Sequence, residues 1–182
     1  MANYFEIVSK YKAAGLSLPV RATANAAGYD LAAAAEIVIH PYLDQMDFLI
    51  NRLDGLNQSN YKEYSLEEMA NLTKSSSVRP KLISTGMKCH LDEDKYLELV
   101  VRSSSPLKYW LICANSVGII DADYYNNPDN EGEIFLQVIN LSPFPIKIKK
   151  GEKIAQGIIK QYHVTKDDNS IAKRVGGFGS TT

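Results

Sequence analysis

Two carboxylates separated by one residue, Asp121 and Asp123, stand between an apolar run and a pair of tyrosines. Residues 118–120 before them are Gly-Ile-Ile, and Tyr124 and Tyr125 follow. An ionised carboxylate can take a proton from water as a general base, and a ring can pack against a ligand. The same spacing also suits an acid that caps its own turn.

The two acids are predicted to lie on the first arm of a β-hairpin. Residues 126–132, Asn-Asn-Pro-Asp-Asn-Glu-Gly, are turn formers, and the alternating run 133–139 is typical of a returning strand. Side chains alternate between the faces of a strand. Asp121 and Asp123 are therefore expected on one face and Tyr124 on the other.

Four further stretches carry residues that could do chemistry. Asp30 follows glycine and tyrosine within residues 27–31, a pattern that also fits a simple turn. Residues 102–106, Arg-Ser-Ser-Ser-Pro, offer one guanidinium and three hydroxyls, which are phosphate donors, or else form a serine-rich turn. Gln156 ends the run 151–156, in which a turn leads into a strand.

The last of these stretches is residues 174–181, Arg-Val-Gly-Gly-Phe-Gly-Ser-Thr. Glycines let the backbone approach phosphate oxygens, and an aromatic ring can cover a base. If this tail binds a ligand, it is expected to be mobile when no ligand is bound. The alternative interpretation is a disordered terminus that binds nothing. The run does not match the phosphate-binding loop of P-loop NTPases.

The composition restricts the class of protein. A chain of 182 residues with 45% hydrophobic residues predicts a single domain with its own core. The net charge of -1 lacks the positive field that a nucleic-acid or membrane-surface binder needs. No leader or membrane-spanning run is present, so a soluble cytoplasmic protein is expected. Cys89 and Cys113 are expected to be small buried hydrophobic residues.

Short strand-like segments separated by turn residues predict an all-β sandwich or barrel. The predicted strands are 4–8, 36–39, 81–84, 96–102, 110–114, 134–139, 146–149 and 154–161. Between Tyr42 and Leu72, apolar residues recur at helical spacing, and Ser65 to Glu68 has the form of a capping box. Two short helices inserted between strands are therefore expected there.

Taken in order, the five stretches resemble the five motifs of the trimeric dUTPase family. They are AGYDL, RSS, GIIDADY, GEKIAQ and RVGGFGST. The resemblance implies a jelly-roll-like subunit and a homotrimer whose active sites are shared among subunits. It also implies Mg²⁺-assisted hydrolysis of dUTP to dUMP and pyrophosphate.

The resemblance also implies roles for the residues of the acidic motif. Asp121 would be the general base that activates the attacking water. Tyr124 would pack against the deoxyribose and leave no room for a 2′-hydroxyl. The residues that would read the uracil edge are Asn115, Gly118, Ile119 and Ile120.

On the phosphate side, Ser103 would contact the oxygen that bridges the α and β phosphates. Arg102, Ser104 and Gln156 would support that contact. Asp30 would lie in the outer shell of Mg²⁺, which the phosphates themselves chelate. The resemblance also implies roles for four residues of the flexible C-terminal arm, residues 174–182. Phe178 would stack over the uracil, and Arg174 would contact the γ-phosphate. Gly179 and Ser180 would surround the phosphates.

The chain departs from the family pattern in three places. The spacing from Arg174 to the double glycine is one residue shorter than in many members, and the hairpin tip is longer. The helical insert, residues 42–79, has no counterpart in compact members, and its apolar stripe must pack on its own subunit or on a protein partner.

Two alternative functions follow. A dCTP deaminase is similar in fold and in its R-S-S stretch, but typically carries D-P-G at the hairpin and lacks the glycine-rich tail. A regulatory protein would bind dUTP as a signal and a partner through the insert.

Overall fold

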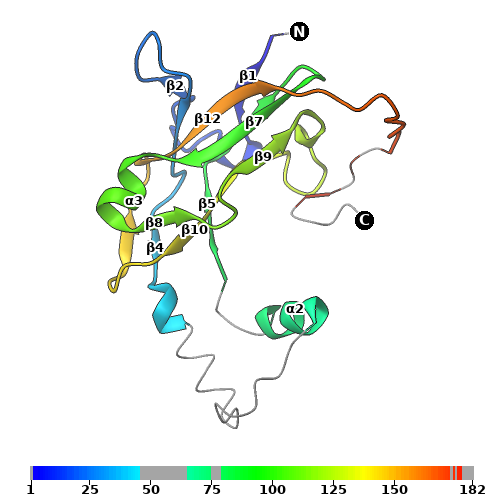
Figure 1. Ribbon diagram of the computed structural model, residues 1–182. Coiled ribbons are helices and arrows are strands. Elements are labelled where there is room, and N and C mark those ends of the chain that lie inside the picture. The colour runs from blue at the N-terminus through cyan, green and yellow to red at the C-terminus, as the bar shows by residue number, and fades with distance from the viewer. Residues whose placement is uncertain (1, 46–64, 75–78, 173, 175, 178–182) are drawn as a thin grey trace.

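The computed structural model describes residues 2–45, 65–74, 79–172, 174, 176 and 177. Antiparallel strands form its body, as the sequence predicts (Figure 1). The strands are β1 (Tyr4–Ile7), β2 (Val20–Arg21), β3 (Tyr29–Ala32), β4 (Ile37–Ile39), β5 (Lys81–Ser84), β6 (Met87–His90), β7 (Lys95–Val101), β8 (Leu111–Cys113), β9 (Gly118–Asp121), β10 (Phe135–Asn140), β11 (Ile146–Ile148) and β12 (Lys153–Gln161). The short helices are η1 (Ser9–Tyr11), α2 (Leu66–Lys74), α3 (Ser104–Tyr109) and η2 (Ala122–Tyr124).

The largest sheet has the strand order β2-β3-β12-β7-β9. At its centre β12 pairs with β7 from Ala155 opposite Val101 to Gln161 opposite Lys95. On the other side, β9 pairs with β7 and places Asp121 opposite Tyr96. The candidate acid therefore lies near the start of β7.

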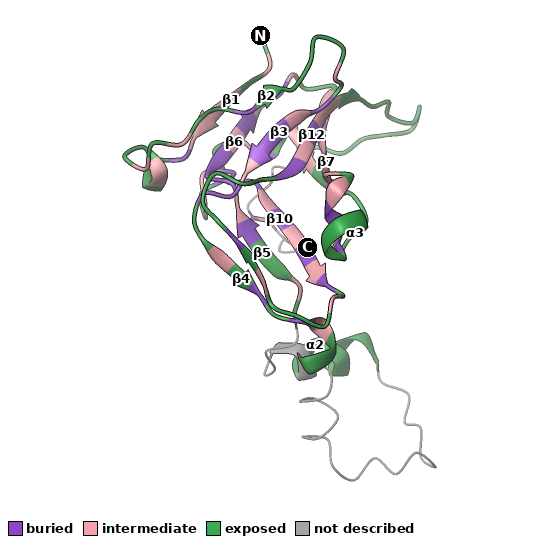
Figure 2. Ribbon diagram, turned by 90° about the vertical axis from the view of Figure 1, so that its left-hand side faces the viewer, coloured by how far each residue is buried: buried purple, intermediate pink, exposed green. Residues whose placement is uncertain are grey.

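Three smaller sheets complete the body, with the orders β5-β10-β8, β1-β6 and β4-β11. The core lies between these sheets and the largest one, and in β6, β7 and β10 buried positions alternate with partly exposed ones (Figure 2). Its fully buried side chains include Leu31, Leu97, Leu99, Ile83, Ile134 and Leu136. Cys89 and Cys113 are free and buried, as expected. No helix among the described residues is long and apolar enough to cross a membrane.

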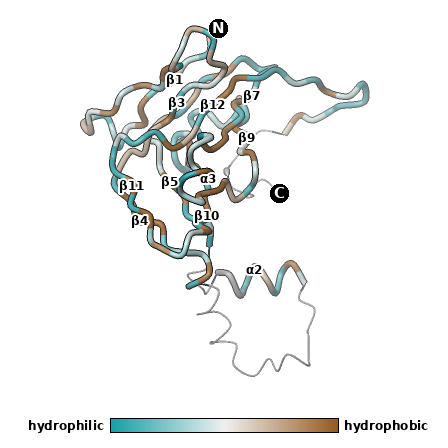
Figure 3. The backbone as a smooth tube through the Cα atoms, turned by 60° about the vertical axis from the view of Figure 1, so that its left-hand side comes forward, coloured by the Kyte–Doolittle hydropathy of each residue, from teal (hydrophilic) through white to brown (hydrophobic). Residues whose placement is uncertain are grey.

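The described part of the 42–79 insert is helical at both ends. Residues 42–45 have helical conformation, and α2 begins with the predicted capping box. Ser65 N–H donates to the Glu68 carboxylate over 2.8 Å, and Glu68 N–H donates to Ser65 Oγ over 3.2 Å. Helix α2 lies apart from the sheets and carries both hydrophobic and hydrophilic segments (Figures 1 and 3). Residues 46–64 and 75–78 of the insert lie outside the described residues.

The predicted β-hairpin is wrong. Strand β9 pairs with β7, whereas the returning strand β10 pairs with β5 and β8. The alternation of side chains also stops at Asp121, because η2 follows it immediately. Asp123 and Tyr124 therefore do not occupy the opposite strand faces that the sequence predicts.

For residues 102–106 a serine-rich turn was one of two interpretations, but residues 104–109 form α3. Proline lacks an N–H group, which the first turn of a helix does not need, so Pro106 is tolerated there. Strands β2 and β6 were also not predicted, and for β3 only a strand start at residues 27–31 was indicated. They are short, and β2 and β3 follow segments rich in alanine and glycine that carry little alternation.

Gly132 closes the turn after η2 with a φ of +76°. A Cβ atom there would overlap the carbonyl oxygen of Tyr124, so Gly132→Ala should lower the melting temperature strongly. Gly151 has a similar φ of +82°, but a Cβ atom there would meet nothing within 4 Å, so Gly151→Ala should cost only the backbone strain, about 1 kcal/mol. Thermal melts of the two variants test this, and an equal loss would show that the overlap relaxes freely.

Candidate active site

A cavity of about 160 Å³ opens where β9 runs into η2. It is lined by predicted site residues from three stretches: Asn115, Gly118, Ile119, Ile120, Asp121, Tyr124 and Arg174. Gly118 is buried against Leu99, and a Cβ at this position would approach the Leu99 Cβ to 3.2 Å. The glycine thus lets β9 lie close to β7 and leaves the neighbouring cavity open.

Asp121 and Asp123 share one cation. The Arg174 guanidinium pairs with the Asp121 carboxylate and, through Nε, with Asp123 Oδ1 at 2.8 Å. Burial raises the pKa of Asp121, the charge of Arg174 opposes that rise, and the Asp123 carboxylate adds to it. The pKa of Asp121 is therefore higher than that of an ordinary aspartate, which makes its carboxylate a stronger base.

The Tyr124 side chain is only 6% exposed, although it lines the cavity. Its hydroxyl accepts a hydrogen bond from Asn130 Nδ2 over 2.7 Å and donates to the Glu133 carbonyl over 3.3 Å. The Arg174 guanidinium lies 5.6 Å from the ring centroid, within the range of a cation–π contact. The ring is thus held at its tip and covered on one face.

A second cluster surrounds Asp30 on β3, whose side chain is almost fully buried. Its carboxylate accepts hydrogen bonds from Lys153 Nζ at 2.9 Å and Gln156 Nε2 at 3.3 Å, and Arg102 Nε lies 3.5 Å away. Burial alone would raise the pKa of Asp30, but the hydrogen bonds from Lys153 and Gln156 and the charge of Arg102 lower it overall. Asp30 is thus an acid held in its charged form.

Ser103 and Ser104 stand beside this second cluster. Ser103 is the N-cap residue of α3 without a side-chain capping bond, and Ser104 is its first residue. Arg102 and Ser104 line a separate cavity of about 310 Å³. The structure therefore brings together Asp30, Arg102 and Gln156 beside the serines. The family resemblance assigns Asp30 to the outer shell of Mg²⁺ and the other residues to phosphate.

The two clusters lie at opposite ends of β7. Asp121 is opposite Tyr96, near the start of the strand, and Arg102 directly follows its last residue, Val101. Six residues of extended chain from Tyr96 to Arg102 span roughly 20 Å. The cavities lined by Asp121 and by Arg102 share no lining residue. The two clusters, called the two candidate half-sites, therefore lie apart within one chain.

The described part of the C-terminal arm lies on the Asp121 cluster. Arg174 pairs with both acids instead of standing free, and Gly176 is buried. A Cβ at Gly177 would approach Tyr124 Cε2 to 2.8 Å, so only glycine allows the backbone to pass this ring without a shift. Phe178, Gly179 and Ser180 lie outside the described residues.

Residue roles that sequence reasoning missed include those of Lys153, Asn130 and Glu133. Lys153 pairs with Asp30 from within the run 151–156. Asn130 and Glu133 support Tyr124 from the turn after η2. The unusual length of that turn was the available signal for Asn130, whereas nothing in the local sequence marks Lys153 as a partner of Asp30.

Comparison with known proteins places the chain in a family. A family model described as dUTPase matches residues 64–182. A deoxyuridine 5′-triphosphate nucleotidohydrolase of Lactococcus lactis subsp. lactis is 37% identical over 179 residues, which cover 97% of this chain and 95% of that protein. The chain belongs to the dUTPase family. Its expected enzyme class, a dUTP diphosphatase, is thereby confirmed.

Solved dUTPase structures agree with the fold. The dUTPase of Streptococcus mutans is 32% identical, with a TM-score of 0.66 over 90% of this chain and 98% of that one. A mutant dUTPase from phage phi11 of S. aureus, in which a structural Mg(II) ion is coordinated, is 16% identical with a TM-score of 0.59 over 93% and 97% of the two chains. The predicted mostly-β, jelly-roll-like dUTPase fold is confirmed.

The Asp30 cluster predicts that the fold loses stability in acid. A lowered pKa stabilises the fold above the unfolded aspartate value of about 3.9, and that contribution is lost as the pH falls through the lower folded value. Asp30→Asn should lower stability at pH 7 by about 2 kcal/mol, a moderate loss because the Lys153 and Arg102 side chains stay 47% and 36% exposed. The deficit should shrink below about pH 4.

The measurement that checks this is the melting temperature of the wild type and of Asp30→Asn between pH 7 and pH 3. Glu36→Gln serves as the matched control, because Glu36 pairs with Lys147 while both side chains are more than half exposed. Such a surface pair contributes at most about 1 kcal/mol, so the control should melt close to the wild type. A deficit of Asp30→Asn that is constant with pH would contradict the assignment.

Proposed function

We propose that this chain hydrolyses dUTP by attack of water on the α-phosphorus, with Asp121 as the general base. The products are dUMP and pyrophosphate. The water gives its proton to the Asp121 carboxylate as its oxygen bonds to phosphorus, and the bond to the bridging oxygen breaks. The raised pKa of Asp121 and its position in the cavity support this role.

The observation that carries the proposal is the distance between the two half-sites. The base must reach water at the α-phosphorus, while Ser103 must contact the oxygen next to that same phosphorus. Both groups therefore have to lie within a few ångströms of one atom. Along β7 they are roughly 20 Å apart in one chain, so the acid and the serine at one substrate come from different subunits.

A homotrimer, as the family resemblance implies, supplies that arrangement three times over. The face around α3 offers surface that an assembly would cover, because large apolar side chains are exposed there. They are Leu107 at 80%, Tyr109 at 52%, Trp110 at 63% and Phe144 at 72%.

On the base side, the sugar would pack on Tyr124, whose ring leaves no room for a 2′-hydroxyl. The uracil edge would lie along the backbone of residues 118–120 with Asn115 beside it. Asn115 Oδ1 already accepts a bond from Cys113 Sγ at 2.9 Å, which leaves the Asn115 amide N–H groups available to a base. A base with the wrong edge would leave buried polar groups unpaired.

On the phosphate side, Ser103 and Ser104 would donate to the phosphates, and Arg102 would balance the charge that grows as pyrophosphate leaves. Gln156 would add a contact next to Asp30. Arg174 would exchange its pairs with Asp121 and Asp123 for the γ-phosphate, since its planar fork suits carboxylate and phosphate alike. Phe178, Gly179 and Ser180 would close over the bound nucleotide.

The residues of the Asp30 cluster fit a Mg²⁺ ion held in the outer shell. Within the described residues, no group of three or more His, Cys, Asp or Glu side chains could hold a metal ion. The Asp30 carboxylate is kept ionised, so it can accept hydrogen bonds from metal-bound water while the phosphates supply the direct ligands. When bound, the ion would neutralise charge on the triphosphate.

Asp121→Asn should reduce kcat for dUTP by about 10²–10⁴-fold, because the amide keeps the shape and loses the base. Binding of a non-hydrolysable dUTP analogue should stay within a few-fold of the wild type. Asp123→Asn is the matched control, because Asp123 also pairs with Arg174. This variant should keep most of the wild-type kcat. Pyrophosphate release from dUTP, dCTP, dTTP and UTP measures both. Retention of more than about a tenth of kcat in Asp121→Asn would exclude it as the base.

The same pair of acids predicts a pH effect. The Asp123 carboxylate raises the pKa of Asp121, so Asp123→Asn should lower that pKa. The acid limb of kcat/KM reports the essential base of the free enzyme and should therefore move to lower pH in this variant. An acid limb that does not move would mean that another group controls it.

Mixed oligomers test the shared site directly. Asp121→Asn and Ser103→Ala should each be nearly inactive alone, and Ser103 makes no side-chain capping bond whose loss would disturb α3. After the two variants are refolded together, roughly a quarter of the sites should carry both native halves if these come from different subunits. No recovery of dUTP hydrolysis in mixtures shown to contain hetero-oligomers would mean that each site lies within one subunit.

A further inference from the structure

The turn that follows η2, residues 125–132, has no part in the proposed reaction, yet it lies directly behind Tyr124. It is folded on itself: Asn126 N–H donates to the Glu131 carbonyl over 3.1 Å, and Asn127 N–H donates to the Tyr124 carbonyl over 3.1 Å. Asn126, Glu131 and Gly132 all have positive φ. A turn built from such conformations has one specific shape, and that shape brings Asn130 to the Tyr124 ring.

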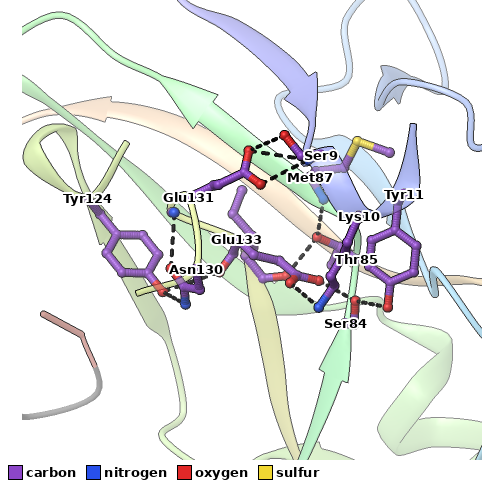
Figure 4. Close-up of polar contacts among 12 residues, drawn as sticks. Ser9, Lys10, Tyr11, Ser84, Thr85, Met87, Tyr124, Asn130, Glu131 and Glu133 are labelled. Carbon is purple, nitrogen blue, oxygen red and sulfur yellow. Dashed lines mark hydrogen bonds and ion pairs between the residues drawn. The ribbon is translucent and has the colours of Figure 1, made fainter. Parts of the chain in front are cut away.

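The amide of Asn130 is engaged at both ends (Figure 4). Its Oδ1 accepts from Gly132 N–H over 3.0 Å, and its Nδ2 donates to the Tyr124 hydroxyl over 2.7 Å. The hydroxyl in turn donates to the Glu133 carbonyl over 3.3 Å. The amide is therefore oriented by the backbone of its own turn, and it holds the tip of the tyrosine at one point.

The turn is itself fastened to the N-terminal segment. The Glu131 carboxylate accepts from Ser9 N–H over 3.1 Å and from Ser9 Oγ over 3.0 Å. The Glu133 carboxylate is buried, pairs with Lys10 Nζ at 2.7 Å and accepts a hydrogen bond from Ser84. Figure 4 shows Asn130 beside the tip of the Tyr124 ring, with both anchored acids on the side away from the ring. A donor fixed in this way cannot follow the ring if the ring moves.

If Tyr124 excludes ribonucleotides by leaving no room for the 2′-hydroxyl, its ring has to be rigid. A tyrosine that could retreat by a fraction of an ångström would admit one additional hydroxyl group on the sugar at little cost. Holding the ring tip makes retreat cost a hydrogen bond in a buried place, where unpaired polar groups are expensive. Such a contact acts on the ligand through the ring alone.

We propose that Asn130 is a positioning residue that holds Tyr124 as a fixed wall and so sets the preference for deoxyribonucleotide over ribonucleotide triphosphates. The inference rests on the proposed packing of Tyr124 against the sugar. Asn130 touches neither substrate nor reacting atoms. Its effect is confined to selectivity.

The experiment measures kcat/KM for dUTP and UTP in the full-length protein, together with melting temperatures. Asn130→Ala should lower the dUTP/UTP ratio about 10-fold, the size expected when one buried hydrogen bond is lost. Asn130→Asp should lower the ratio by a similar factor, because its carboxylate still accepts from Gly132 N–H but has no N–H to donate to the tyrosine hydroxyl, whose single proton goes to the Glu133 carbonyl. In a Tyr124→Phe background, Asn130→Ala should change the ratio less than about two-fold, since the contact is already absent.

Ser9→Ala is the matched control for a general loosening of the turn. It removes one hydrogen bond to Glu131 and leaves the contact of Asn130 with Tyr124 intact, so it should lower stability without changing the ratio. A change of the ratio in Ser9→Ala as large as in Asn130→Ala would overturn the specific role. So would an unchanged ratio in Asn130→Ala.

Tyr124→Ala separates this inference from the proposed function. If Tyr124→Ala lowers the ratio while Asn130→Ala leaves it unchanged, the sugar contact of the ring stands and the inference about Asn130 fails. If Tyr124→Ala itself leaves the ratio unchanged, the proposed role of the ring fails and the inference fails with it.

Discussion

The pairing of β7 with β12 is the constraint on which both half-sites depend. These strands form the middle of the largest sheet, with β3 against β12 and β9 against β7. Their register places Asp30 and Gln156 opposite one another near the end of β7 and Asp121 near its start. A shift of one residue would turn every side chain to the other face and separate these groups. Buried Leu97 and Leu99 fix that register from within the core.

Much of the fold could be predicted from the sequence because its longer strands alternate clearly. Strand β7 at 95–101 and β10 at 135–140 lie within one residue of their predicted bounds. The pairing between strands could not be predicted in the same way. The run 118–121 and the run 133–139 are neighbours in sequence, and only the core decides that the first joins β7 and the second joins β5 and β8. Local pattern fixes the strand, whereas tertiary packing fixes its partner.

The candidate site residues that the sequence could indicate are those whose side-chain chemistry and surrounding motif point to the same role. Asp121 lines a cavity as expected, and Asp30, Arg102 and Gln156 meet although 126 residues separate Asp30 from Gln156. Lys153 and Asn130 escaped prediction because their importance lies in a partner. A lysine after a turn and an asparagine within one are ordinary surface residues until the fold places a buried carboxylate or a tyrosine hydroxyl beside them.

The two acids, Asp30 and Asp121, show how environment separates functions that sequence cannot. Asp30 meets two cations and an amide donor, which outweigh its burial and lower its pKa. Asp121 is also partly buried, and burial is the main reason that its pKa rises; its single cation, Arg174, opposes the rise, and the second carboxylate, Asp123, adds to it. A carboxylate stabilised as strongly as Asp30 is a poor proton acceptor, although it is a permanent negative charge for water around a cation. A carboxylate that shares its cation, as Asp121 does, remains more basic than Asp30. A general base has to be ionised and also have a pKa high enough to accept a proton. The different environments of the two acids therefore support the proposed assignment of the base to Asp121 rather than to Asp30.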